Sequence, residues 1–288
     1  DDLKKRIKSV KSTQKITKAM KMVAAAKLRK AQESAEKGRP YSQKMQNIIL
    51  NLTKSISDPQ NAPKLLVGTG EDKKYLCVVL TADRGLCGGF NSNICKLAKN
   101  NFKKILSEGK DLKIITVGSK GLDQIKREYG KYVIKKFSFK EKKQITFEEA
   151  NIVGNEIISL FNQNEFDKCI LFFNNFKNVI TQIPQAQQII PTEVNKNNEP
   201  EEKTFSYEFE PEEDEILEDL LPKNISTQVF KALLENAASE QGSRMTAMDN
   251  ATRNAGDLVD KLTINYNRSR QASITKELIE IISGAESL

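Results

Sequence analysis

The chain has 288 residues, of which 38% are hydrophobic and 29% are charged, and its formal net charge is +8. This length and composition suit one large or two modest globular domains and exclude a disordered protein. Histidine, the commonest general base, is absent, and the four cysteines show no C-x-x-C spacing, so we expect free thiols and no structural zinc site. The net positive charge favours an anionic partner, which could be a nucleic acid, a membrane surface or an acidic protein surface. No apolar run approaches the roughly 20 residues of a membrane-spanning helix, so the chain is expected to be soluble or peripheral to a membrane.

Residues 1–58 are predicted to form one long helix. Their apolar residues recur at steps of four and three, in two groups separated by a shift of phase: Leu3, Ile7 and Val10, then Ile16, Met20 and Val23. This spacing is typical of a coiled coil, and the shift predicts an irregular supercoil.

The same segment is strongly basic, because residues 1–30 contain eleven Lys or Arg and only two acids. Solvated helices usually mix both signs of charge, so the one-signed surface indicates an acidic partner. A nucleic acid is the alternative, although the stretch offers no aromatic side chain for base stacking. An acidic protein surface fits better.

Residues 59–222 are predicted to form a Rossmann-like α/β head. The runs "YLCVVL", "LKIITVG" and "KCILFFN" have the length and apolar character of buried strands, with helical stretches between them. "ITQIPQAQQIIP" and "TFSYEFEP" indicate weaker strands, and residues 194–203 indicate an exposed polar loop.

The loop "TADRGLCGGFN", residues 81–91, follows the first of these strands and raises the question of nucleotide binding. Its glycines, Gly85, Gly88 and Gly89, match neither G-x-G-x-x-G nor G-x-x-x-x-G-K-[ST]. We therefore favour a turn that packs or contacts a partner, in which Asp83 and Arg84 could pair or cap the next helix. A Rossmann-type enzyme is the alternative, and saturable binding of ATP or NAD would support it.

Residues 223–288 follow the last proline and are predicted to form a second long helix, on the order of 85 Å from about Ile225 to Ile282. Its apolar stripe consists of Leu258, Leu262, Ile274, Leu278 and Ile281. One such helix cannot bury its stripe alone. We therefore expect the fold class to be α/β with a long antiparallel coiled coil, in which the two terminal helices pair and the middle of the chain forms the head.

Three quoted segments together resemble the gamma-subunit family of F-type ATP synthases. They are "IKSVKSTQKITKAMKMVAAAKLRKAQ" (residues 7–32), the loop "TADRGLCGGFN", and "SEQGSRMTAMDNATRNAGDLVDKLTINYNRSRQASITKELIEIISGA" (residues 239–285). The resemblance covers both termini and the first strand, loop and helix of the head. Residues 128–222 carry little recognisable pattern and rest on position alone.

The resemblance implies a non-catalytic subunit that binds no cofactor and acts as the central rotor stalk. In this family the coiled coil stands inside a ring of catalytic and non-catalytic nucleotide-binding subunits. The head sits on the proteolipid c-ring beside small rotor subunits, peripheral to the membrane. Proton-driven rotation of that ring changes the catalytic sites in sequence, which is coupling through differential contact and requires no nucleic acid.

The resemblance also implies roles for individual residues. Arg270, Gln271 and Thr275 match a segment that hydrogen-bonds loops of the catalytic subunits, and residues 281–288 would occupy an apolar sleeve. Lys18, Met20 and Lys21 match the stretch that faces an acidic lever, whereas Arg84 and Gly85 would contact the ring or a small rotor subunit. Met20 could instead belong to the coiled-coil seam, and Thr275 could be an ordinary helix-surface residue.

The start of the sequence and its last helix bear on location. It begins at Asp1 without an initiator methionine or signal-like stretch, which suggests a processed or trimmed product. Together with "KELIEIISGA", this favours a mitochondrial inner-membrane protein on the matrix side. A bacterial plasma membrane, on the cytoplasmic side, is the alternative. No cysteine-bearing insertion precedes the last helix, so plastid-type redox control is not expected.

Overall fold

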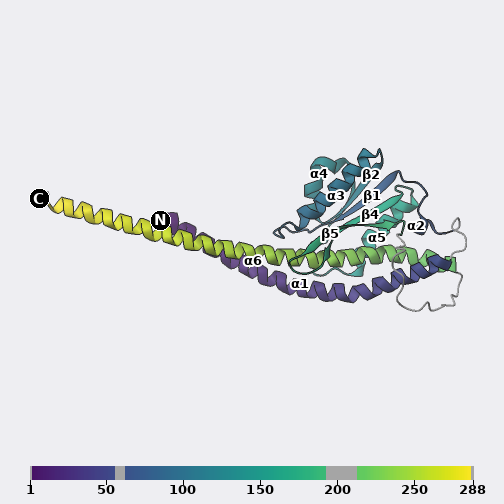
Figure 1. The fold of residues 1–288 in the computed structure, drawn as a ribbon, viewed down its shortest axis with the longest axis horizontal. Coiled ribbons are helices and arrows are strands. Elements are labelled where there is room, and N and C mark those ends of the chain that lie inside the picture. Colours follow the sequence, from purple (N-terminus) through teal and green to yellow (C-terminus); the bar gives the residue numbers. More distant parts are fainter. Residues whose placement is uncertain (1, 56–61, 193–212, 287–288) are drawn as a thin grey trace.

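A computed structural model describes residues 2–55, 62–192 and 213–286. Two long helices, α1 (Asp2–Ser55) and α6 (Glu213–Glu286), run antiparallel and form a shaft, with the α/β head on one flank (Figure 1). Beyond the N-terminus of α1, α6 continues alone to the C-terminal tip. This confirms the predicted pairing of the two termini.

The shaft is held by a seam of mostly small side chains. On α1 the seam includes Thr17, Ala24 and Leu28, all at most 9% exposed. The Thr17 and Thr252 hydroxyl oxygens lie 2.8 Å apart across it. A Cβ on Gly256 of α6 would lie 3.0 Å from Gln14 Nε2, so the two backbones approach closely.

The predicted shift of phase on α1 is wrong. Ile16 and Val23 are 57% and 55% exposed, and only Met20 of that group is partly buried. The half-buried Leu3, Ile7 and Val10 continue in register through Gln14 and Thr17, so polar side chains occupy seam positions where we expected apolar ones. On α6, Leu258 is likewise 44% exposed, and the seam residues are Ala255, Val259 and Leu262.

Helix α6 begins earlier than the predicted segment, at Glu213, and passes through Pro222. A proline inside a helix removes one backbone hydrogen bond and crowds the preceding turn. Here the apolar contacts of Leu217 and Leu221 with Met45, Ile49 and the short helix α2 (Lys64–Val67) offset that cost. The division into segments 1–58, 59–222 and 223–288 remains a proposal, because α6 belongs to both shaft and head.

The head contains a five-stranded sheet in the order β3-β2-β1-β4-β5, parallel except for β5, which is antiparallel to β4. Its strands are β1 (Lys74–Leu80), β2 (Asp111–Val117), β3 (Val133–Phe137), β4 (Lys168–Phe176) and β5 (Gln182–Ile190). Its other helices are α3 (Phe90–Ser107), α4 (Ser119–Tyr129), the 3-10 turn η1 (Gly130–Tyr132) and α5 (Phe147–Asn162). Four of the expected strands are present and β3 was not expected. The strand predicted at residues 204–211 lies outside the described residues.

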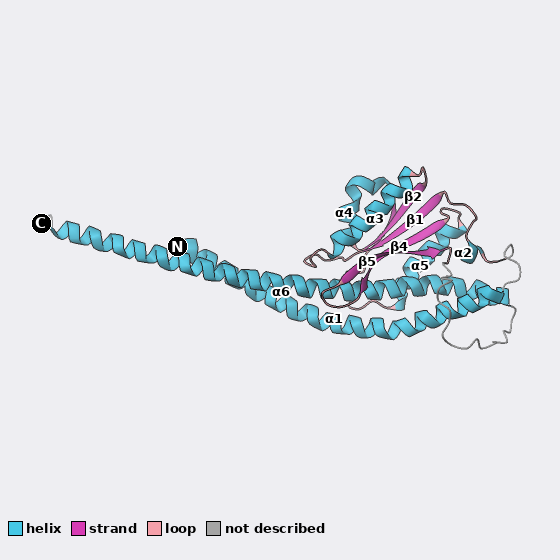
Figure 2. Ribbon diagram, in the orientation of Figure 1, coloured by secondary structure: helices cyan, strands magenta, loops and turns pink. Residues whose placement is uncertain are grey.

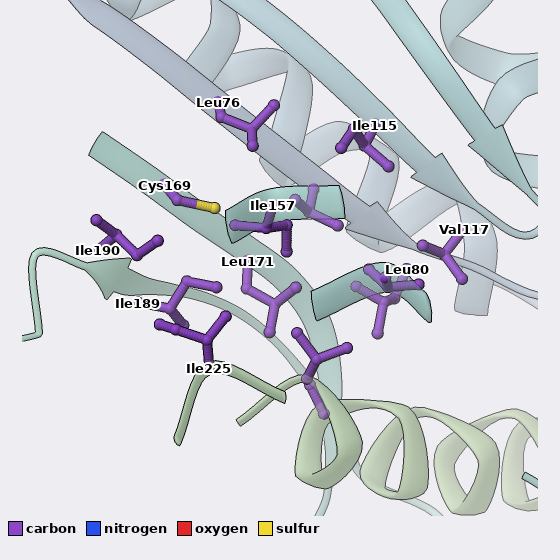
Figure 3. Packing of buried hydrophobic residues seen from close by; sticks show 14 of the residues in the cluster. Leu76, Leu80, Ile115, Val117, Ile157, Cys169, Leu171, Ile189, Ile190 and Ile225 are labelled. Atoms are coloured by element: carbon purple, nitrogen blue, oxygen red, sulfur yellow. The ribbon is translucent and has the colours of Figure 1, made fainter. Parts of the chain in front are cut away.

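Helices cover both faces of the sheet (Figure 2). Because side chains alternate along a strand, Cys77 and Val79 of β1 pack under α3 and α4, whereas Leu76 and Leu80 face α5 and α6. The buried cluster around Leu76 and Leu80 also includes Ile225 of α6 (Figure 3). The same helix therefore forms part of the head core and the whole length of the shaft.

Three further observations concern the described ranges only. No helix there is long and apolar enough to cross a membrane. No group of three or more cysteine, aspartate or glutamate side chains could hold a metal ion. The four cysteines are buried free thiols.

Candidate partner-binding surfaces

Asp83 and Asn91 of loop 81–91 accept hydrogen bonds from neighbouring segments. Asp83 Oδ1 accepts hydrogen bonds from the Ser119 N–H at 2.8 Å and the Ser138 hydroxyl at 2.7 Å, which joins the loop to α4 and to the segment after β3. Asn91 Oδ1 accepts the Ala82 N–H at 2.9 Å. These bonds fix the exit of β1 and the start of α3.

The backbone of the loop lies against α6 between Arg84 and Gly88. The guanidinium of Arg244 donates to the carbonyl oxygens of Arg84 and Gly85, both at 3.3 Å. The Ser243 hydroxyl donates to the Cys87 carbonyl at 2.6 Å. At Gly88, where φ is +55°, an added Cβ would lie 3.4 Å from Ser243 Oγ. The loop thus presents carbonyl oxygens to the shaft in the geometry of a packing turn, whereas a phosphate would require convergent N–H groups.

Arg244 also pairs with Glu240 one turn away, at 2.8 Å. Burial raises the pKa of Glu240, and the positive charge of Arg244 opposes that rise. The sequence did not predict that Arg244, Ser243 and Glu240 hold the loop. The i, i+4 spacing of an acid and an arginine was the available signal, but such pairs usually lie on a solvated face.

The predicted residues Arg84 and Gly85 lie together on this turn. Their carbonyls face α6, while the Arg84 side chain is exposed and the space beyond Gly85 is open. Next to them, Leu86 is 63% exposed. The outer edge of the turn therefore offers one cation and one apolar side chain to another molecule.

The predicted residues of α1 fall into two environments. Lys18 is exposed and has no ion pair within the described part of the chain. Lys21 is half-buried, and its ammonium lies 2.6 Å from Asp249 Oδ1 on α6. Met20 is partly buried between them. Lys18 is therefore available to a partner, whereas Lys21 already binds an acid of its own chain.

The residues predicted to bind partners near the C-terminal tip all lie on the exposed last part of α6. Arg270, Gln271 and Thr275 are exposed, and the Thr275 hydroxyl donates to the Gln271 carbonyl of its own helix at 2.9 Å. Around them, apolar side chains are 48% to 68% exposed: Ile274, Leu278, Ile279, Ile281 and Ile282. No part of α1 lies beside this segment (Figure 1). A lone helix with this much exposed apolar surface is typical of a binding segment.

These groups do not form one site. The loop lies on the head, Lys18 and Lys21 lie on the shaft, and Arg270 to Thr275 lie beyond the end of α1, so they are spread along the long axis of the molecule. Such an arrangement can contact several partners at once.

Comparisons with known proteins agree with the resemblance found in the sequence. A family model described as ATP synthase matches residues 1–288. The ATP synthase gamma chain of Pelagibacter ubique is 72% identical over 290 residues, covering 100% of this chain and 99% of the relative. That of Rhizobium etli is 55% identical over 289 residues, covering 100% and 98%.

Solved structures agree on the fold. A chain of the central stalk and c-ring structure of Tetrahymena thermophila mitochondrial ATP synthase has a TM-score of 0.63 and 27% identity, covering 82% of this chain and 99% of that one. A chain of the Euglena gracilis mitochondrial ATP synthase has a TM-score of 0.69 and 20% identity, covering 99% and 93%, and supports the fold alone.

Proposed function

Because this chain belongs to the family of ATP synthase gamma chains, we propose that it is the central rotor stalk of an F-type ATP synthase. One observation carries the proposal. The 74-residue helix α6 runs unbroken from the core of the head to the unpartnered tip. At 1.5 Å per residue it spans on the order of 110 Å, so a rotation of the head is delivered to the tip by one covalent element.

The shaft acts through its asymmetry. Around its axis it presents lysines of α1, the exposed apolar side chains Ile16, Met22 and Val23, and the acids of α6. A subunit that meets one face gains different contacts from a subunit that meets another. Rotation therefore biases three otherwise equal catalytic subunits toward different conformations, which is coupling by differential binding energy.

The partners follow from the surfaces. Lys18, with Met20 and Lys21 beside it, would face an acidic lever of the catalytic subunits. Arg270, Gln271 and Thr275 would hydrogen-bond loops of the ring, and the apolar tip would occupy a sleeve formed by the catalytic and non-catalytic subunits. The head would rest on the proteolipid ring and small rotor subunits, with Arg84 and Gly85 on one contact edge.

We propose that the chain itself makes and breaks no bonds. The polar residues of its glycine loop are occupied in structural hydrogen bonds: Asp83 with Ser119 and Ser138, and Asn91 with Ala82. This supports a non-catalytic role and makes a nucleotide-binding enzyme the weaker alternative.

The location is proposed to be the cytoplasmic side of a bacterial plasma membrane. The mitochondrial assignment favoured by the sequence is not confirmed. Support for the bacterial alternative comes from gamma chains of bacteria at 55% and 72% identity, against 27% or less for the two mitochondrial structures compared above.

Native mass spectrometry of the complex purified through a tagged catalytic subunit tests the proposal, with ATPase activity measured on the same sample. We expect one copy of this chain per ring of three catalytic and three non-catalytic subunits. Recovery of the active ring with several copies, or with none, would overturn the rotor assignment.

A further inference from the structure

A groove of about 560 Å³ lies between α1, α6 and the start of α5. In Figure 2, α1 bows away from α6 beneath the head. The groove is lined by residues 34–42 of α1, by residues 227–235 of α6, and by residues 144–147, which lead into the first turn of α5. Each helical wall is nine residues long, about 12 Å or two turns. None of the surfaces described above includes this groove.

Three hydroxyl groups that line the groove are already bonded within the chain. The Ser42 hydroxyl donates to the Arg39 carbonyl, and the Thr227 hydroxyl donates to the Lys223 carbonyl. The Thr146 hydroxyl donates to the Glu149 carboxylate at 2.6 Å. Because these donors are occupied, the groove offers little to a polar small molecule.

Its remaining lining is apolar, and part of it is exposed at the rim. Ile145, Phe230 and Leu234 line the interior. At the rim Tyr41 is 54% exposed and Phe147 is 36% exposed. Phe147 meets Phe230 edge-on, with ring centroids 5.5 Å apart. Exposed aromatic rings beside an apolar groove are the composition of a protein-docking site.

The unpaired charges that line the groove are positive. Glu235, the acid of the lining, is 3% exposed, pairs with Arg39 at 2.9 Å and accepts the Phe176 N–H at 3.1 Å, so its charge is neutralised. Lys37 of α1 and Lys231 of α6 stand on opposite walls, and within the described ranges neither forms an ion pair. The groove therefore favours an apolar segment with acidic flanks.

We propose that this groove is the docking site for an acidic amphipathic helix of another rotor subunit, an inference that rests on the proposed function. Two turns of helix would place apolar anchors at i and i+4 between α1 and α6, with Asp or Glu beside Lys37 and Lys231. Because the groove joins α1, α6 and the start of α5, the bound helix would brace the shaft against the head.

Photo-crosslinking in the assembled complex tests the docking site. p-Benzoylphenylalanine replaces Tyr41 in the full chain, and the adduct is mapped by mass spectrometry. We expect it on a helix of another rotor subunit that carries Asp or Glu within one turn of an apolar residue. An adduct on the catalytic ring, on the proteolipid ring, on lipid or only within this chain would overturn the proposal.

Charge reversal supplies the matched comparison. Lys37→Glu with Lys231→Glu should lower the adduct yield at least fivefold. Lys96→Glu with Lys104→Glu, exposed lysines of α3 on the other face of the sheet, makes the same change of charge and should leave the yield unaltered. Equal yields from both pairs would refute the charge argument. If the ring is recovered with one copy of this chain and no adduct forms, the docking site alone fails; if the chain is not recovered with the ring, the proposed function fails.

Discussion

At the residue scale, Arg244 is the connection between the glycine turn and the shaft. The residue is 9% exposed, and its guanidinium donates to two carbonyl oxygens of the turn and pairs with the Glu240 carboxylate at once. The guanidinium does this with two nitrogens of a rigid fork, whereas a lysine ammonium has a single nitrogen and does not match that geometry.

Arg244→Ala should therefore loosen the turn and destabilise the chain. The substitution leaves two carbonyls and a buried acid without their cation, a loss of about 1–3 kcal/mol. Urea unfolding of the full chain measures the loss, and hydrogen exchange of residues 84–89 should rise. Arg253→Ala is the control, because Arg253 is 69% exposed and pairs only at the surface, so a change within about 0.5 kcal/mol is expected. Equal effects of the two substitutions would refute the role of Arg244.

A second residue-scale prediction concerns pH and the first turn of α5. The Glu149 carboxylate accepts the Thr146 N–H at 2.8 Å and lies 2.9 Å from the Lys142 ammonium. Burial alone would raise the pKa of Glu149, but these donors together lower it from 4.5 to about 2. Because the folded pKa is the lower one, the stabilisation is present above about pH 4.5 and is lost as the pH falls toward 2.

Glu149→Gln should accordingly lower the free energy of unfolding at pH 7 by about 1 kcal/mol, the usual loss for a helix cap. The difference from the original chain should shrink as the pH falls below 4.5. Urea midpoints at a series of pH values measure it. A difference that does not change with pH would show that the carboxylate charge is not involved.

At the element scale, the sheet was predictable where strands are buried. β1, β2 and β4 are apolar runs with helices on both faces, so their sequences alone marked them. β3 was missed because "VIKKF" is a five-residue edge strand whose middle is exposed and carries two lysines. Lysines on an edge strand hinder pairing with other chains. They also interrupt the apolar run from which a strand is predicted.

The sequence predicted that the two terminal helices pair along a seam, but it predicted the wrong residues for part of that seam. Gln14 and Thr17 continue the seam because their partners on α6 are small or polar, as the contact between the Thr17 and Thr252 hydroxyls shows. Those partners lie more than 200 residues away in the sequence, 235 in the case of Thr252. Apolar spacing within one helix contains no information about them, so Ile16 and Val23 were wrongly taken as seam residues.

Lys21 illustrates the consequence for testing partner contacts. Reversing the charge of Lys21 alone breaks its ion pair with Asp249 and also removes a cation from the outer surface. A single substitution therefore does not separate the role of Lys21 in shaft stability from its role in partner binding. Lys21→Glu should lower the stability of the chain by less than about 1 kcal/mol, because the pair is partly exposed. Adding Asp249→Lys should restore that stability.

The coupling of the complex separates the two roles. If Lys21 faces an acidic lever, ATP-driven proton pumping should stay impaired in the double variant, because the cation has moved to α6. Lys18→Glu, at an exposed position, should impair pumping without changing the urea midpoint. Full recovery of pumping in the double variant would assign Lys21 to the shaft alone.

At the scale of the whole molecule, α6 is stabilised differently along its length. Its first part packs against both the head and α1, its middle pairs with α1, and its last part has neither neighbour (Figure 1). The sequence could predict that this last part is helical and apolar. It could not show where α1 ends beside it, and that depends on the antiparallel register of the two helices.

The exposed tip gives the final prediction. Ile274, Leu278 and Ile281 form one stripe at i, i+4 and i+7, and are 48%, 53% and 68% exposed. Replacing all three by Gln keeps helix propensity and should leave the urea midpoint of the isolated chain unchanged, because no buried contact is lost. Burying each side chain in a sleeve is worth up to about 1.5–3 kcal/mol, so retention of the chain by the catalytic ring should weaken at least 100-fold.

The matched control replaces three polar neighbours on the same turns: Lys276→Gln, Glu277→Gln and Glu280→Gln. It removes only an exposed ion pair, Lys276 with Glu280 at 3.7 Å, and should assemble normally. Gel filtration of the reconstituted ring measures the bound chain in both cases. Since the two variants alter exposed positions on the same turns of one helix, a selective loss with the apolar stripe would locate the binding energy of the tip in its burial. Equal retention of both variants would mean that the shaft is held below the tip, where α1 and α6 run together.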